Sequence, residues 1–188
     1  VFVAGPVWRD RLWLGGGIYA PYAAILDFPD DGPQRWQHTD VTDVCTIHDY
    51  SHPIEALLER YASTRLSGLP PEHGWHKSKA LFLQGAQYRG QPIVFSEVGG
   101  YLLAPDHPER RRDRLYDSYG TVRNEDELAQ RYRTLMEGLA SLPFLAGLCY
   151  TQLTDVEHEQ NGLLTADRVP RMPPDQVASM HKQLWPNA

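Results

Sequence analysis

The sequence predicts an α/β fold in which parallel strands alternate with crossover helices. Three apolar runs have the length and composition of strands, at residues 43–50, 92–96 and 145–153. A segment with helical spacing of apolar residues follows each run. This strand–helix order is typical of a parallel sheet with helices packed on it, and 188 residues suffice for one domain with a buried core.

The first strand reads DVCTIHDY and leads into a predicted helix. Pro53 suits the first turn of that helix, because proline lacks the backbone N–H that a first turn leaves unbonded. The spacing of three and four residues then predicts one apolar helix face, made of Ile54, Leu57, Leu58 and Tyr61. Residues 66–76 are rich in proline and glycine and predict a loop, and residues 77–88 predict a short helix.

The second strand belongs to the stretch PIVFSEVGG, residues 92–100. Its continuous apolar run favours a strand covered on both faces, and the run meets Glu97 at its carboxyl end. Gly99 and Gly100 then permit a sharp turn. Active sites in α/β folds lie at the carboxyl ends of the strands, so Glu97 is a candidate catalytic carboxylate. The alternative is a loop glutamate that is solvated or paired.

The third strand is preceded by a helix with a clear beginning. After a polar loop at 101–123, Asn124 is expected to cap the helix, with Glu127 three residues later. Its buried stripe is predicted to be Leu128, Tyr132, Leu135 and Leu139. After the third strand and a loop, a final helix is expected to present Val177, Met180, His181 and Leu184 on one side.

Composition excludes several classes of protein. A net charge of −6 and a pI near 5.7 argue against a nucleic-acid-binding surface. No apolar run approaches the roughly 20 residues that span a bilayer, so no membrane partner is expected. No targeting signal is visible, and a cytoplasmic location is the default expectation. Cys45 and Cys149 are expected to be buried free thiols, and the eight histidines show no zinc-binding spacing, so no metal or cofactor is expected.

Three segments together resemble a known enzyme family. They are WQHTDVTDVCTIHDY at 36–50, GQPIVFSEVGG at 90–100 and GLCYTQLTDVEHEQNGLLTADRVPR at 147–171. These segments are similar to the C-terminal part of the catalytic domain of glycoside hydrolase family 2, which includes β-galactosidases and β-glucuronidases. The resemblance covers roughly residues 36–184, so residues 36–188 are expected to be a partial catalytic domain, and residues 1–35 stay an unassigned, diverged segment.

The resemblance implies a fold and a mechanism. The fold would be the C-terminal portion, about strands 5/6 to 8, of an incomplete TIM (β/α)8 barrel. The mechanism would be retaining hydrolysis of a β-glycoside, by default a β-galactoside, with Glu97 as the nucleophile and Tyr50 beside it. A nucleophilic carboxylate must stay ionised, and a tyrosine hydroxyl donating a hydrogen bond helps to keep it so.

Five further residues are candidates for contact with the sugar. Strand alternation places His48 and Tyr50 on one face of their strand, and Tyr150 and Gln152 on one face of theirs. Asp155 lies in the matching tail. Four of them have a plainer alternative: structural roles for His48 and Tyr50, core packing for Tyr150, and a salt bridge or solvated loop for Asp155.

The acid/base carboxyl of the family has no counterpart in this chain. In the family that glutamate follows an asparagine, and the one Asn-Glu pair here, Asn124-Glu125, is predicted to begin a helix. The isolated chain is therefore expected to be inactive, and its open barrel edges are expected to favour self-association. The alternatives are an inactive remnant that at most binds carbohydrate, or a different barrel hydrolase whose second carboxylate is Asp49, Asp155 or Glu157.

Overall fold

The computed structural model describes residues 43–73, 80–82, 84–103, 120–156 and 159–185, together with the short strand β1, Leu14–Gly15. The rest of the segment 1–35 lies outside the described residues. The chain divides into two compact units. Unit 1 is formed by Val1–Asp49, Glu59–Val98 and Phe144–Cys149, and unit 2 by Tyr50–Leu58, Gly99–Pro143 and Tyr150–Ala188.

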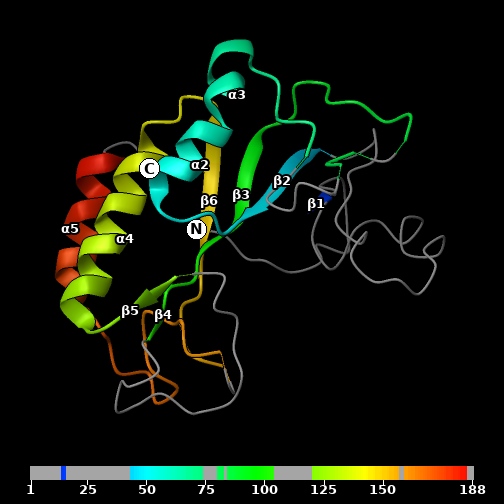
Figure 1. Ribbon diagram of the computed structural model, residues 1–188. Coiled ribbons are helices and arrows are strands. Elements are labelled where there is room, and N and C mark those ends of the chain that lie inside the picture. Colours follow the sequence, from blue (N-terminus) through cyan, green and yellow to red (C-terminus); the bar gives the residue numbers. More distant parts are fainter. Residues whose placement is uncertain are drawn as a thin grey trace. The chain divides into compact units, whose positions relative to one another are not determined.

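A four-stranded sheet in the order β1-β2-β3-β6 organises unit 1. Strand β2 is Val44–Asp49, β3 is Ile93–Gly99 and β6 is Leu145–Thr151. Strands β1 and β2 pair in parallel, as do β2 and β3, and Figure 1 shows β6 beside β3 and running the same way. The three strands predicted from the sequence therefore lie next to one another in the sheet, in the order in which they occur along the chain.

Aromatic side chains pack against one another beside the sheet. The Tyr61 ring lies with its centroid 4.9 Å from that of Phe95 and 6.0 Å from that of Phe144. Tyr61 and Phe95 are fully buried, as are Cys45, Ile47 and Ile93. By contrast, β6 contains no fully buried residue, which is the behaviour of a strand at the edge of the described sheet.

Two short helices follow β2, where the sequence predicted a single one. Helix α2 is Ile54–Arg60 and α3 is Ala62–Ser67. The predicted apolar face is confirmed for Ile54, Leu57 and Tyr61, which are buried, whereas Leu58 is only partly buried. Gly68 ends α3 with φ +71°, a left-handed conformation that glycine adopts without steric cost.

Helices α4 (Glu125–Ala140) and α5 (Pro174–Leu184) lie side by side in unit 2. The predicted stripe of α4 is confirmed, and Met136 joins it in the core. On α5, Met180 is buried as expected. The hydroxyl of Tyr132 on α4 lies 2.9 Å from Nε2 of His181 on α5, so a polar contact supplements the apolar packing of the two helices.

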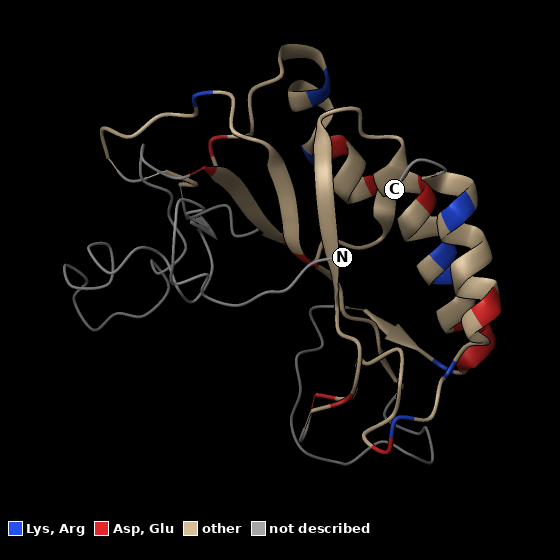
Figure 2. Cartoon of the chain, turned by 180° about the vertical axis from the view of Figure 1, so that it is seen from behind, with Lys and Arg blue, Asp and Glu red and all other residues tan. Residues whose placement is uncertain are grey.

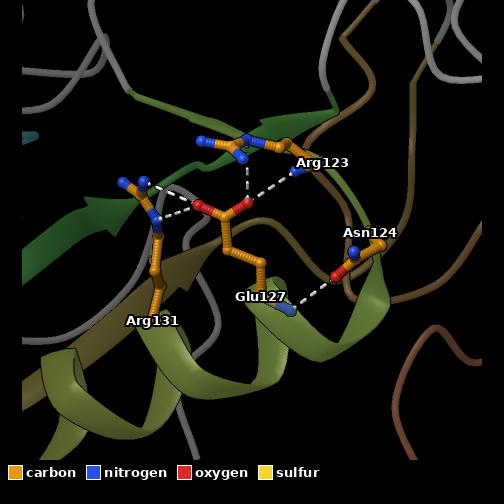
Figure 3. A network of polar contacts seen from close by, with 4 residues as sticks. All are labelled: Arg123, Asn124, Glu127 and Arg131. Atoms are coloured by element: carbon orange, nitrogen blue, oxygen red, sulfur yellow. Dashed lines mark hydrogen bonds and ion pairs between the residues drawn. The ribbon is translucent and has the colours of Figure 1, made fainter.

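The start of α4 confirms the predicted cap and adds to it (Figure 3). The Asn124 Oδ1 atom accepts a 2.9 Å hydrogen bond from the backbone N–H of Glu127. The Glu127 carboxylate accepts in turn from the backbone N–H of Arg123 at 2.9 Å and from the Arg131 guanidinium at 2.8 Å. These bonds, the Arg123 amide first, lower the pKa of Glu127 below its usual value.

Three sequence predictions are wrong in detail. Residues 80–82 and 84–88 of the predicted 77–88 helix are not helical, because Gly85 adopts φ +89° and Ala80 pairs with His73 instead. The 101–123 loop contains β4 (Leu102–Leu103) and β5 (Thr121–Val122), which pair in parallel. The second strand continues to Gly99 and so carries Glu97 within it.

Most charged residues lie outside the strands, although Asp49, Asp155 and Arg171 are buried. Figure 2 shows Lys, Arg, Asp and Glu on helices and loops, whereas the strands of the sheet are uncharged over most of their length. None of the helices in the described ranges is long and apolar enough to cross a membrane. The described residues also contain no cluster of three or more His, Cys, Asp or Glu side chains that could hold a metal ion.

Candidate active site

A break in strand register brings two predicted site residues together. From Cys45 to Ile47, β2 pairs in step with Ile93 to Phe95 of β3. The register then shifts, so that His48 lies opposite Glu97 and Ser96 is passed over. An extra residue of this kind is a β-bulge, and bulges next to active sites re-aim the side chain that follows. Without the bulge, Ser96 would face His48.

The side chains of His48 and Glu97 make a direct contact. Nδ1 of His48 lies 2.9 Å from Oε2 of Glu97, a distance typical of a charge-assisted hydrogen bond. The Glu97 side chain is 34% exposed and the His48 side chain 17% exposed. Glu97 is therefore held by a partner and still open to a ligand, which a nucleophilic carboxylate requires.

The neighbouring acid, Asp49, faces the opposite side of β2 and has a structural environment. Its side chain is fully buried, and its Oδ2 atom accepts a 2.9 Å hydrogen bond from the Tyr61 hydroxyl. Nε of Arg60 lies 3.2 Å from the same oxygen. Burying a carboxylate is costly unless it is paired, and here a hydrogen bond from Tyr61 and an ion pair with Arg60 offset that cost. This environment gives Asp49 a structural role instead of the role of second catalytic carboxylate considered from the sequence.

The thiol of Cys149 on β6 interacts electrostatically with the carboxylate of Glu97. Burial raises the pKa of the Cys149 thiol, and the negative charge of Glu97 raises it further. Cys45 is also free, but its complete burial raises its pKa to about 12. Both thiols are free as expected, but only Cys45 is buried, whereas Cys149 is partly exposed. Cys149 can therefore report the charge on Glu97.

We expect the Glu97→Gln variant to alkylate faster at Cys149 than the wild type. Removing the negative charge lowers the thiol pKa, so more thiolate is present at a fixed, mildly alkaline pH. The measurement is the rate of iodoacetamide modification at Cys149, followed by peptide mass spectrometry. The rates should converge at pH values where the thiol is fully ionised in both proteins, and Cys45 should stay unmodified in both. Equal rates at mildly alkaline pH would place Glu97 away from the thiol.

The remaining predicted site residues belong to unit 2, where Tyr150 is partly exposed and packs against Tyr132. Its ring packs edge-on against Tyr132, with centroids 5.0 Å apart and planes at 70°. Burial and the nearby Tyr101 hold the pKa of Tyr150 well above its usual value, opposed in part by hydrogen bonding with the backbone of Tyr101 and Gly100. This is the packing alternative named for Tyr150, and its contact with a sugar stays a prediction.

The glycine pair after Glu97 has a packing reason. Gly99 has φ +91°, and a Cβ atom there would overlap the ring of Tyr150. Gly100 has φ +74°, and its Cβ would lie 3.1 Å from Cε1 of the buried Tyr50. The sequence predicted a sharp turn at these glycines, and the structure shows that they also let the backbone approach two tyrosine rings. The hydrogen bond expected from Tyr50 to Glu97 stays a prediction.

Gln152 and Asp155 organise the loop after β6. Nε2 of Gln152 donates to Oδ1 of Asn161 at 2.8 Å. Asp155 is buried, with Oδ2 2.7 Å from Nη2 of Arg171 and Oδ1 accepting from the backbone N–H of Gly162 at 2.8 Å. The salt bridge named as the alternative for Asp155 is therefore present. Sugar contact by either residue stays a prediction, and Glu157 lies outside the described residues.

Sequence reasoning found His48 and Glu97 separately and missed their pairing. Strand alternation alone would put Ser96 opposite His48, and no residue in PIVFSEVGG marks the bulge. It also missed the proximity of Cys149, because the sequence does not give the stagger of β6 against β3. Buried Asp49 had a signal in hindsight, since Arg60 and Tyr61 lie at the end of the helix that follows β2 and both pair with it.

No protein-family model matches the sequence, and no curated protein matches it. Solved structures with a similar backbone are glycoside hydrolases. The agarase AgWH50C matches 78% of this chain and 19% of its own, with 14% identity and a TM-score of 0.46. A family 2 β-galacturonidase from Eisenbergiella tayi matches 77% of this chain and 24% of its own, with 14% identity and a TM-score of 0.46.

A β-glucuronidase from Bifidobacterium dentium matches 77% of this chain and 21% of its own, with 17% identity and a TM-score of 0.43. This chain thus spans about a fifth of the length of such proteins. Similarity at this level does not bear on function by itself.

Proposed function

We propose that this chain is the nucleophile-bearing part of a retaining β-glycosidase, similar to a β-galactosidase, with Glu97 as the nucleophile. The observation that carries the proposal is the placement of Glu97. It lies near the carboxyl end of a parallel strand, remains one-third exposed, and receives a 2.9 Å contact from His48. The segments that resemble glycoside hydrolase family 2 support the same role. The barrel assignment for the sheet remains part of this proposal.

The proposed step is attack by a carboxylate oxygen of Glu97 on the anomeric carbon of a β-glycoside. A covalent glycosyl–enzyme bond forms as the bond to the leaving oxygen breaks. In most substrates the leaving oxygen takes a proton from a second carboxyl group about 5–5.5 Å from the first. His48 would restrain Glu97 so that little reorganisation is needed at the moment of attack.

The second carboxyl is proposed to come from outside this chain. Among the described residues, Asp49 and Asp155 are buried in ion pairs, and Glu125 lies in the first turn of α4. The chain by itself is then able to displace only leaving groups that depart without protonation. We therefore expect no hydrolysis of alkyl β-glycosides by the 188-residue chain. The self-association expected of open sheet edges stays a prediction, for which half-exposed β6 is the candidate edge.

Covalent labelling tests the proposal on the chain as it exists. Dinitrophenyl 2-deoxy-2-fluoro-β-glycosides carry a leaving group that needs no proton, and their fluorine slows breakdown of the glycosyl–enzyme bond. We expect one of the galacto, gluco or glucurono compounds to add one sugar mass to the protein, located by peptide mapping at Glu97. Labelling at another carboxylate would contradict the assignment. Failure of all three compounds would favour a chain that binds carbohydrate at most.

A further inference from the structure

The hydrogen-bonding chemistry of His48 and Glu97 determines which of the two donates the proton in their contact. Each ring nitrogen of a neutral histidine either donates or accepts, whereas an ionised carboxylate only accepts. Nδ1 of His48 lies 2.9 Å from Oε2 of Glu97. If Glu97 is ionised, the proton must therefore be on Nδ1, and His48 donates it. The Nε2–H form is the one that a free imidazole prefers, so this arrangement selects the less common tautomer.

The sheet is built so that this pair can form. Regular pairing through Ile47 and Phe95 would next bring Ser96 opposite His48, and the bulge replaces Ser96 by Glu97. The Ser96 hydroxyl is buried and has no hydrogen-bond partner within the described part of the chain. A buried hydroxyl without a hydrogen-bond partner lowers stability. The bulge thus leaves the Ser96 hydroxyl without a hydrogen bond to any described residue, while the next residue, Glu97, gains its contact with His48.

We propose that His48 is a positioning residue for Glu97: it holds the carboxylate through an Nδ1–H···Oε2 hydrogen bond and fixes the orientation from which Glu97 attacks. The proposal rests on the proposed function and deepens it. It differs from the substrate-binding role expected of His48 from the sequence. A substrate contact would govern how tightly a sugar binds, whereas a positioning contact governs how fast bound sugar reacts.

The first test needs no substrate. In protein labelled with ¹⁵N-histidine, long-range ¹H–¹⁵N spectra show which ring nitrogen carries the proton, and the His48→Gln variant identifies the His48 signals. We expect Nδ1 of His48 to be protonated in the wild type, in either the neutral or the doubly protonated ring. In Glu97→Leu, which lacks the acceptor, the neutral ring should revert toward the Nε2–H form. An unprotonated Nδ1 in the wild type, or no change in Glu97→Leu, would overturn the pairing.

The second test separates positioning from binding. Asparagine places its amide near the position of Nδ1, whereas glutamine places its amide near that of Nε2. With the fluoroglycoside that labels the wild type, His48→Gln should lower the maximal labelling rate about 100-fold with a nearly unchanged half-saturating concentration. His48→Asn should recover much of that rate. A raised half-saturating concentration with an unchanged maximal rate would instead show that His48 binds the sugar, and would overturn the positioning role.

The two tests also separate this inference from the proposed function. In one outcome, Nδ1 is protonated and depends on Glu97, but no fluoroglycoside labels the chain. That result would contradict both the glycosidase function and the positioning role, and the contact of His48 with Glu97 would be only structural. Labelling at Glu97 with an unprotonated Nδ1 on His48 would keep the function and overturn the positioning role. Labelling, Nδ1 protonation and rescue by asparagine together would support both.

Discussion

Replacing Glu97 by glutamine is expected to abolish covalent labelling by dinitrophenyl 2-deoxy-2-fluoro-β-glycosides. The amide of glutamine is too weak a nucleophile to attack the anomeric carbon, although it has nearly the shape of the carboxylate. Loss of a catalytic nucleophile lowers rates by about 10⁴-fold or more, so the adduct should fall below detection. The measurement is the intact mass of the protein after incubation, compared with wild type at equal concentration.

The fold should survive this change almost intact. Glu97 is one-third exposed, and glutamine can still accept a hydrogen bond from His48 through its side-chain oxygen. We expect the free energy of unfolding to change by no more than about 1 kcal/mol. As a matched control, a small-residue variant, Glu97→Ala, should react with azide and a dinitrophenyl β-glycoside to give an α-glycosyl azide. Persistent labelling in Glu97→Gln would show that another group is the nucleophile.

Replacing Gly99 by alanine is expected to cause a large loss of stability. The backbone of Gly99 has φ +91°, and a left-handed conformation costs a residue with a Cβ atom roughly 1–2 kcal/mol. The added Cβ would also overlap the ring of the tightly packed Tyr150, and overpacking of this kind costs about 1–3 kcal/mol. The sum is about 2–5 kcal/mol, measurable by urea unfolding.

Gly85 provides a matched control for the backbone part of this effect. Its φ of +89° is nearly the same, but a Cβ there would meet nothing within 4 Å. Gly85→Ala should therefore show the conformational cost without the overlap. A Tyr150→Ala background should relieve the overlap, so the double-mutant cycle should give a favourable coupling between the two changes. Equal losses at Gly85 and Gly99 would mean that the Tyr150 contact adds nothing.

Much of the local structure could be predicted from the sequence because its causes are local. Asn124 and Glu127 have the spacing of a helix cap, and the hydrogen bonds of α4 follow from that spacing. Strong apolar runs gave β2 and β6 to within two residues. Prediction failed where a local signal was weak, as at 77–88, where Gly85 interrupts a segment that otherwise has helical composition.

By itself the sequence located the three strands and singled out Glu97 and His48, because period and residue type depend on neighbours along the chain, and the expectation that these strands are neighbours came from the family resemblance. Only the tertiary structure decided that these two side chains meet and that Asp49 is buried against Tyr61. It also decided that the Tyr150 ring lies too close to Gly99 for a residue with a Cβ atom. A bulge shifts register by a single residue and reverses which face the next side chain occupies. That choice depends on packing between strands distant in the sequence, and no pattern within either strand records it.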